Sequence, residues 1–210
     1  MKKKEQIQRW VQLFLLAVLA GCAIGIGGAV YLSIDVKIAG ALMFTIGLYS
    51  ICVHGLNLYT GKVGYLFEKK PAYLLELLII WIGNLAGTFL MAALLLCTRV
   101  KGISELAKTM CQAKIEDNFG SLLVLGVFCG FLMYVAVDGY AKTKNPIILF
   151  MGVATFILSG FEHCVADMFY FSVAEMWSPD VFLRVLVITL GNSIGGVLIS
   201  LVKKIKPAGA

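Results

Sequence analysis

The residue of this chain best suited to chemistry is a histidine inside a long apolar stretch. His163 directly follows Glu162 and precedes Asp167 by four positions, and the segment around them is mostly apolar. Ionisable side chains are costly inside a membrane, where they usually face a partner or a water-filled cavity. We therefore expect His163 to line a polar path through a membrane; a neutral histidine packed in the interior is the alternative.

The two carboxylates beside this histidine do not have the spacing of a catalytic pair. Glu162 and Asp167 are five positions apart, so they would not share one helical face as residues four apart do. We expect Glu162 to hold an interrupted backbone or to orient a neighbouring group. His54 precedes a similar glycine-containing stretch, but it is the weaker pore candidate, because neighbouring backbone could satisfy it. The sequence predicts no catalytic residue.

These residues lie in a chain that is far more apolar than a soluble domain. Hydrophobic residues make up 60% of it and charged residues 14%, with a mean hydropathy of +0.91. A membrane-spanning helix needs about 20 apolar residues, and continuous rather than alternating apolar runs argue against a strand barrel. The sequence predicts an all-α membrane protein with six transmembrane helices at about residues 10–32, 38–59, 74–97, 121–141, 147–171 and 181–202.

The formal net charge of +6 is explained by membrane orientation, so no nucleic-acid partner is needed. With the N-terminus inside, twelve of the 18 Lys and Arg residues lie in inner segments and six in outer ones. The inner residues are Lys2, Lys3, Lys4, Arg9, Lys62, Lys69, Lys70, Lys142, Lys144, Lys203, Lys204 and Lys206; the outer ones are Lys37, Arg99, Lys101, Lys108, Lys114 and Arg184. Because positive residues are enriched in cytoplasmic loops, both termini are predicted to be cytoplasmic.

Glycine spacing indicates two related halves. The G-x-x-x-G element that begins at Gly21 matches the one that begins at Gly126, and Gly55 matches Gly160, both at an offset of 105 (126 − 21 and 160 − 55). A third pair has the sequence G-N-x-x-G and an offset of 108 (191 − 83): residues 83–87 and 191–195. Three spans in each half would place the halves upside down relative to each other. We expect one channel domain, 1–210, with inverted repeats at about 10–97 and 121–202.

In inverted-repeat folds the site lies near the membrane midplane, where paired helices are interrupted. The second and fifth helices are the candidates, since each carries a glycine beside polar residues, at 54–61 and 159–167. We expect both helices to be broken there, with unwound backbone lining a pore.

Residues 160–168 have the sequence G-F-E-H-C-V-A-D-M, which resembles the G-F-E-H-S-x-A-N-M signature of the formate/nitrite transporter family. Residues 58–61, L-Y-T-G, are similar to the family's L-F-T-G, and the two G-N-x-x-G elements also match. The resemblance covers nearly the whole chain. It implies a homopentamer of aquaporin-like protomers in lipid, each with a pore for formate, nitrite, hydrosulfide or a similar monovalent anion, often with a proton.

The resemblance also implies roles for individual residues. His163 would be the central pore histidine, Thr60 would lie on the loop that interrupts the second helix, and Lys114 would be the outer-vestibule lysine, with a solvated surface charge as its alternative. The apolar constrictions, for which core packing is the alternative, would be Phe44, Leu48, Leu58, Tyr59 and Phe156.

Four residues depart from the family pattern. Asp167 replaces a usual Asn, Asn57 stands where an acidic residue is common, Gly130 replaces an Asn, and Tyr59 replaces a usual Phe. These departures bear on substrate preference. Asn57, Glu162 and Asp167 are all expected to lie beside the pore.

A bare anion is costly in an apolar constriction, whereas a protonated weak acid is not. We therefore expect Lys114 to attract the anion and a proton from water or His163 to neutralise it, in a non-enzymatic channel of a prokaryotic plasma membrane. Two alternatives stay open: a haem-binding membrane oxidoreductase with His54 and His163 as iron ligands, and a silent scaffold subunit. No cofactor or metal is otherwise predicted, since none of the six cysteines forms a C-x-x-C pair.

Overall fold

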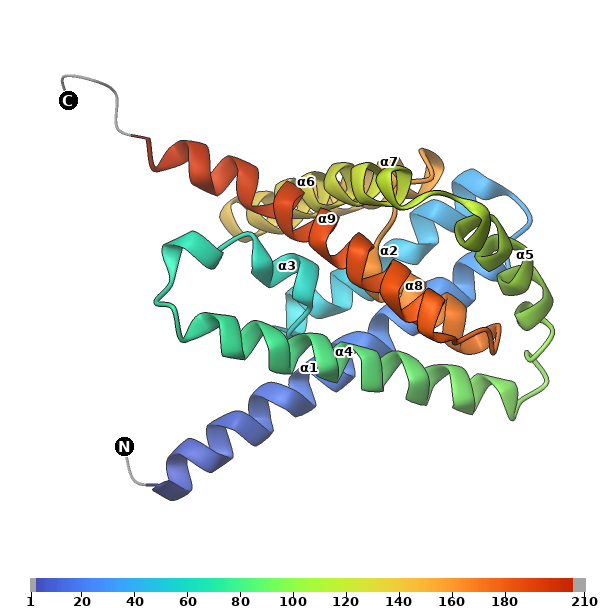
Figure 1. The fold of residues 1–210 in the computed structure, drawn as a ribbon, viewed down its shortest axis with the longest axis horizontal. Helices are drawn as coiled ribbons and strands as arrows, with labels where there is room; N and C mark the ends of the chain where they lie inside the picture. The colour runs from blue at the N-terminus through green and yellow to red at the C-terminus, as the bar shows by residue number, and fades with distance from the viewer. Residues whose placement is uncertain (1–2, 206–210) are drawn as a thin grey trace.

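The structure, a computed structural model, describes residues 3–205, and within that range it is built from helices joined by short turns. Lys2 and Lys206, which were counted among the inner charges, lie outside the described residues, as does the side chain of Lys3. The elements (Figure 1) are α1 Lys3–Leu32, α2 Lys37–His54, α3 Tyr59–Val63, η1 Leu66–Glu68, α4 Tyr73–Leu96, α5 Ile103–Glu116, α6 Phe119–Thr143, α7 Ile147–Leu158, α8 Cys164–Val173 and α9 Pro179–Lys203.

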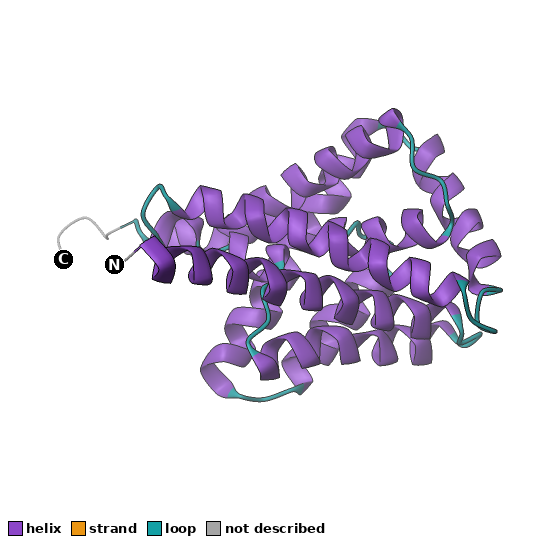
Figure 2. Cartoon of the chain, turned by 90° about the horizontal axis from the view of Figure 1, so that it is seen from below, coloured by secondary structure: helices purple, strands orange, loops and turns teal. Residues whose placement is uncertain are grey.

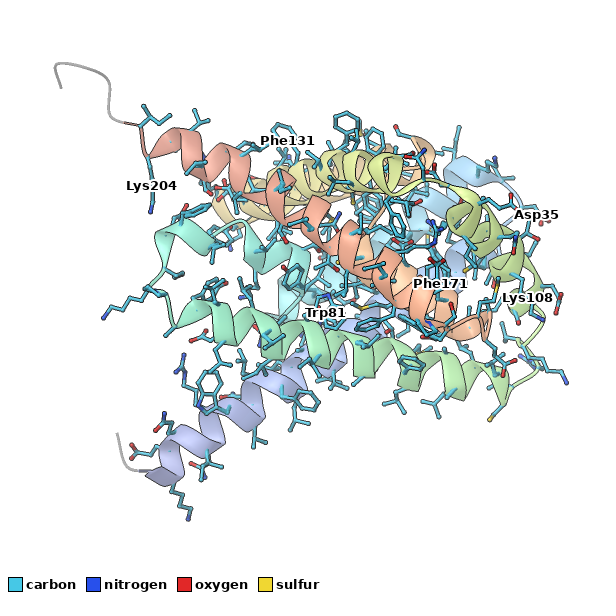
Figure 3. All side chains as sticks on the ribbon, in the orientation of Figure 1. Asp35, Trp81, Lys108, Phe131, Phe171 and Lys204 are labelled. Carbon is cyan, nitrogen blue, oxygen red and sulfur yellow. The ribbon has the colours of Figure 1, made fainter. Side chains whose placement is uncertain are left out.

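Five of these helices are long and apolar enough to cross a membrane: α1, α2, α4, α6 and α9. The predicted span at 147–171 is instead divided between two shorter apolar helices, α7 and α8. Charged side chains such as Asp35 and Lys108 lie at one end of the bundle and Lys204 at the other, with Trp81 and Phe171 between them (Figure 3). The all-helical, membrane-embedded class predicted from composition is confirmed.

Glycine ends two of the helices near the middle of the bundle. Gly55 follows α2 with φ of 65°, and its N–H donates to the carbonyl of Ile51. Gly160 stands in the corresponding place after α7 with φ of 69°. Residues with a side chain rarely adopt this left-handed conformation, whereas glycine does so at little cost. After each glycine the chain is non-helical for three residues before α3 or α8 begins.

Close helix crossings depend on small residues in two pairs of helices, α1 with α4 and α6 with α9. A Cβ atom at Gly87 would collide with the carbonyl oxygen of Val18, and one at Gly195 with that of Val127. Small residues at such positions let membrane helices approach closely.

The structure corrects the predicted pairing of glycines in the first and fourth spans. Gly21 of α1 packs on the carbonyl of Asn84, and Gly130 of α6 packs in the same way on that of Asn192. Their offset is 109 (130 − 21), so the pairing of Gly21 with Gly126 was wrong by four residues. Because glycine recurs every four positions in these helices, the sequence pattern alone could not distinguish registers one helical turn apart.

The beginning of α1 and the end of α9 lie at the same end of the bundle (Figures 1 and 2). Helix α5 lies at the opposite end (Figure 1). The first and last described residues, 3 and 205, are therefore on one side of the layer formed by the long apolar helices.

Candidate functional site

Two cavities reach into the bundle from its opposite ends. The terminal cavity, about 820 Å³, lies toward the end of the bundle where α1 begins and is lined by Arg9, Leu48, Asn57, Leu58, Lys62, Lys69, Lys70, Glu76 and Lys144, among others. The α5 cavity, about 330 Å³, is lined by Tyr31, Phe44, Lys114, Asp117, Phe156, Glu162, His163, Asp167 and Tyr170, among others. The segment that follows Gly55 lines the terminal cavity, and the segment that follows Gly160 lines the α5 cavity.

Apolar side chains lie between the two cavities. Phe44 and Leu48, one turn apart on α2, line the α5 cavity and the terminal cavity respectively, and each is 1% exposed. Phe156 packs edge-on against Phe44, with ring centroids 6.1 Å apart, while Leu58 closes the terminal cavity. A charged solute would lose its hydration in passing these groups.

Tyr59 is placed differently from the other four predicted constriction residues. It lines neither of the two cavities, and its hydroxyl lies 2.8 Å from Ser193 Oγ on α9. Ser193 in turn donates to the carbonyl of Thr189, so the Tyr59 hydroxyl donates to Ser193. The tyrosine hydroxyl is therefore engaged at the α9 wall and not in the path.

His163 joins the two interrupted regions. It is the N-cap of α8, where its Nδ1 accepts from the N–H of Ala166 at 3.0 Å, and its Nε2 lies 2.9 Å from Thr60 Oγ1. Because Nδ1 accepts, the neutral ring carries its proton on Nε2 and donates to Thr60. The ring also stacks on Phe156, with centroids 5.5 Å apart. His163 and Thr60 are thus both buried and mutually fixed.

Lys114 pairs with both predicted carboxylates in the wall of the α5 cavity. Its ammonium contacts Glu162 and lies 3.0 Å from Asp167 Oδ1, with the Lys114 side chain only 14% exposed. Burial by itself would lower the pKa of Lys114, but Asp167 and Glu162 raise it above its usual value. Lys114 is therefore not a solvated surface charge. Although the two carboxylates do not share a helical face, they meet at this lysine.

Two buried asparagines hold the interruptions in place, a role that sequence reasoning missed. Asn192 Nδ2 donates to the carbonyls of Gly126 and Glu162, and its Oδ1 accepts from the N–H of Cys164. Asn84 makes the equivalent bonds at the segment that follows Gly55. Its Nδ2 donates to the carbonyls of Ala17 and Asn57, and its Oδ1 accepts from the N–H of Tyr59. The signal that could have indicated this role was the Gly-Asn pair, which occurs in both G-N-x-x-G elements. The side chain of Asn57 itself donates to the carbonyl of Leu13.

Arg184, which the sequence marked only as an outer positive charge, anchors the end of α5. Its Nη1 donates to the carbonyls of Lys114 (3.0 Å) and Asp117 (2.6 Å), and its Nε pairs with Asp180. The guanidinium also lies over the ring of Phe119, 4.9 Å from its centroid. Arg184 therefore positions the backbone that carries Lys114.

We expect Arg184→Gln to loosen the C-terminal turn of α5. Hydrogen bonds to charged groups contribute about 1.5–3 kcal/mol each, so amide exchange at residues 112–118 should rise at least about tenfold, since about 1.4 kcal/mol is a factor of ten. Hydrogen–deuterium exchange read by mass spectrometry measures this. Arg99→Gln, at an exposed position of the α4–α5 connection, is the matched control; equal exchange in both variants would contradict the anchoring role.

The geometry does not support the haem alternative. A histidine that ligates iron needs a free ring nitrogen, but both nitrogens of His163 are engaged within the protein. His54, the last residue of α2, is exposed, whereas His163 is 2% exposed. Among residues 3–205 no group of three or more His, Cys, Asp or Glu side chains is arranged to hold a metal ion.

Comparison with known proteins gives consistent matches along the chain. The sequence model of the family described as formate/nitrite transporter matches residues 1–204. Formate channel FocB of Escherichia coli (strain K12) is 27% identical over 240 aligned positions, covering 91% of this chain and 85% of that protein. Formate channel FocA of Haemophilus influenzae is 26% identical over 203 positions, covering 77% and 71%.

The fold is also similar to solved structures. A chain described as a pentameric formate channel with formate bound superposes with a TM-score of 0.79 at 23% identity, covering 93% of this chain and 96% of that one. A second, described as an FNT family ion channel, has a TM-score of 0.80 at 21% identity, covering 93% and 91%.

Proposed function

Because this chain belongs to the formate/nitrite transporter family, we propose that it is a membrane channel for small monovalent anions of weak acids, such as formate, nitrite or hydrosulfide. The family is one of transporters, so the prediction that the chain is not an enzyme is confirmed. The curated relatives that support formate as one candidate are named formate channels.

The observation that carries this proposal is the pair of cavities that face each other across the bundle. Each is polar at its mouth, and a short apolar barrier beside His163 and Thr60 separates them. A selective pore needs favourable access from both sides and a barrier that only a suitable solute crosses. Four of the five predicted constriction residues line the cavities next to this barrier: Phe44, Leu48, Leu58 and Phe156.

The solute crosses this barrier as a neutral acid. Lys114 draws the anion into the α5 cavity, where burial makes the charged form costly and favours proton uptake by the anion. The neutral molecule then passes Phe44 and Phe156, reaches Leu48 and Leu58, and releases its proton to water in the terminal cavity. No covalent bond to the protein is formed. His163, held by Thr60, supplies polar contact at the barrier.

The architecture that supports this pathway has six spans, with α7 and α8 together forming the fifth and α2 and α3 the second. Residues 1–210 form one aquaporin-like channel domain of two inverted halves, at about 10–97 and 121–202. The matching bond sets of Asn84 and Asn192 support this division.

The assembly is a homopentamer in a prokaryotic plasma membrane. Many large apolar side chains are exposed on the single chain, as expected for surfaces that meet lipid or other copies, and a similar solved chain is described as pentameric. The terminal cavity faces the cytoplasm, because Arg9, Lys62, Lys69, Lys70 and Lys144 all line it.

Stopped-flow light scattering on proteoliposomes tests the proposal, with formate, nitrite, hydrosulfide, lactate and chloride each offered at two pH values. Selective uptake of weak acids that accelerates at lower pH is the expected result. Flux equal to that of empty liposomes for every anion would overturn the channel function.

We expect His163→Phe to lose proton-coupled uptake while the assembly remains intact. The substitution removes the bond to Thr60 and the polar contact at the barrier, whereas loss of an N-cap costs only about 1 kcal/mol. An internal pH dye in the same liposomes measures protons taken up with the anion. His54→Phe, at the exposed end of α2, is the control; unchanged proton coupling in His163→Phe would contradict the role.

A further inference from the structure

The ion cluster around Lys114 in the α5 cavity contains one more acidic group than this lysine can neutralise. Lys114 contacts Glu162 and Asp167, whose side chains are 7% and 2% exposed. Asp167 Oδ1 faces the ammonium, but Oδ2 is buried without a hydrogen-bond partner among the described residues, although Asp167 lines the cavity. Buried polar atoms are nearly always paired. This oxygen is therefore placed to bind something that the cavity admits.

The charges facing Asp167 do not balance if both carboxylates are ionised. The charged groups that act on it are Glu162 and Lys114. Asp117 lines the same cavity, but its oxygens accept from Ser121 Oγ and the N–H of Asn118, and Arg184 is committed to Asp180 and to two carbonyls. The other titratable side chains around the cavity include no further carboxylate, lysine or arginine among the described residues: they are Tyr31 on α1, Cys111 on α5, Cys129 on α6, Cys164 and Tyr170 on α8, and His163.

One lysine with two carboxylates would leave a net charge of −1 in a wall that must attract anions. Burying an uncompensated charge is very costly, so such groups tend to neutralise by binding a proton. When two carboxylates share a site, one of them usually retains its proton for the same reason. The unpaired oxygen of Asp167 is the position where that proton would face the cavity.

We propose that Lys114, Glu162 and Asp167 together hold one exchangeable proton, and that Asp167 delivers it to the anion in the α5 cavity. This inference rests on the proposed channel function and identifies the proton donor that the neutral-acid mechanism needs. It also assigns a function to Asp167, one of the residues in which this chain departs from the family pattern.

His163 is less suited to be the donor. Its Nε2–H is directed to Thr60 and its Nδ1 accepts the N–H of Ala166. Donating the Nε2 proton would therefore break the bond to Thr60, and accepting a proton on Nδ1 would break the bond that caps α8. Asp167 Oδ2 accepts no hydrogen bond from the described residues, so the carboxylate left by proton release loses no existing bond, and Oδ1 stays 3.0 Å from Lys114.

The transfer itself is a single proton exchange. One oxygen of the anion accepts a hydrogen bond from Lys114 and another from protonated Asp167. The O–H bond of Asp167 breaks as the O–H bond of the weak acid forms, and the ionised carboxylate then regains a proton from water in the cavity. This geometry suits a small oxyanion that is the conjugate base of a weak acid. Chloride cannot take up the proton, so it would be excluded.

Asp167→Asn tests the inference, because the amide has nearly the same shape and cannot transfer a proton. It also leaves Lys114 paired with Glu162, so the net charge of the three side chains is the same as when Asp167 carries its proton. We expect the half-saturating formate concentration to be no higher than in the wild type, whereas the maximal uptake rate at pH 7 falls at least about a hundredfold, the lower end of the usual contribution of a positioned proton donor. Asp167→Glu should recover part of the rate.

Infrared spectroscopy of the same proteoliposomes adds a measurement that does not depend on transport. The wild type should show the carbonyl band of a protonated carboxylic acid at neutral pH, sensitive to exchange into D₂O, and Asp167→Asn should lose it. Glu105→Gln, an exposed carboxylate on α5 with 76% of its side chain accessible, is the matched control and should keep both the band and the rate.

The outcomes separate the two proposals. An unchanged infrared band in Asp167→Asn, or an unchanged maximal rate beside an active wild type, would overturn the proton-donor role while leaving the channel standing. A wild type without anion flux would overturn the channel function and the delivery step with it.

Discussion

Replacing Asn192 by leucine is expected to abolish anion uptake and to reduce strongly the yield of folded protein. The side chain of Asn192 bonds both backbone groups that flank His163, the carbonyl of Glu162 and the N–H of Cys164. Leaving a buried backbone group unpaired costs about 1–3 kcal/mol, against a total stability of about 5–15 kcal/mol for typical proteins. The interruption that presents His163 would therefore lose its shape even in molecules that still fold.

Two measurements check this prediction: the thermal midpoint in detergent by size-exclusion chromatography after heating, and formate uptake in proteoliposomes. Asn118→Leu is the control: Asn118 caps α6 at an exposed site, where its Oδ1 accepts from the N–H of Ser121. Loss of such a cap costs about 1 kcal/mol. Uptake by Asn192→Leu within twofold of that by Asn118→Leu would show that the asparagine does not hold the site.

Lys114→Met has the second large expected effect, a rise of at least about tenfold in the half-saturating anion concentration, or about 1.4 kcal/mol in binding. The substitution removes the cation of the α5 cavity and leaves Glu162 and Asp167 facing each other without compensation. Removing one partner of a buried ion pair costs about 3–5 kcal/mol, so the variant should also be less stable. Concentration series of uptake at constant pH measure the first effect, and thermal unfolding the second.

A triple variant separates folding from anion attraction. Lys114→Met combined with Glu162→Gln and Asp167→Asn removes all three charges of the buried ion cluster, so stability should return while uptake stays low. Lys108→Met, an exposed lysine on the same helix, should behave as the wild type. If the triple variant took up formate with the wild-type half-saturating concentration, Lys114 would have no role in drawing the anion in.

The candidate site was predictable from the sequence to the extent that motifs marked it. His163, Glu162 and Asp167 were recognised as polar residues in an apolar run, and the structure places all three at the α5 cavity. Lys114 was expected there only by resemblance, since a loop lysine has no local signature. The roles of Asn84, Asn192 and Arg184 were not foreseen, because each bonds to backbone far away in the chain.

The sequence by itself determined the helical membrane class and the two glycines at which α2 and α7 end. Both follow from local physics: a backbone in lipid must satisfy its own hydrogen bonds, and Gly55 and Gly160 adopt a conformation that other residues avoid. These properties are present in a short segment of chain whatever surrounds it.

Only the tertiary structure decided which side chains meet. It paired Thr60 with His163 across 103 positions, turned Tyr59 toward Ser193, and set Gly21 against Asn84 as Gly130 is set against Asn192. Such contacts depend on how each helix is rotated and shifted along its neighbour. A shift of one turn leaves the apolar periodicity of a helix almost unchanged, so packing of the whole bundle selects the register that the sequence pattern leaves open.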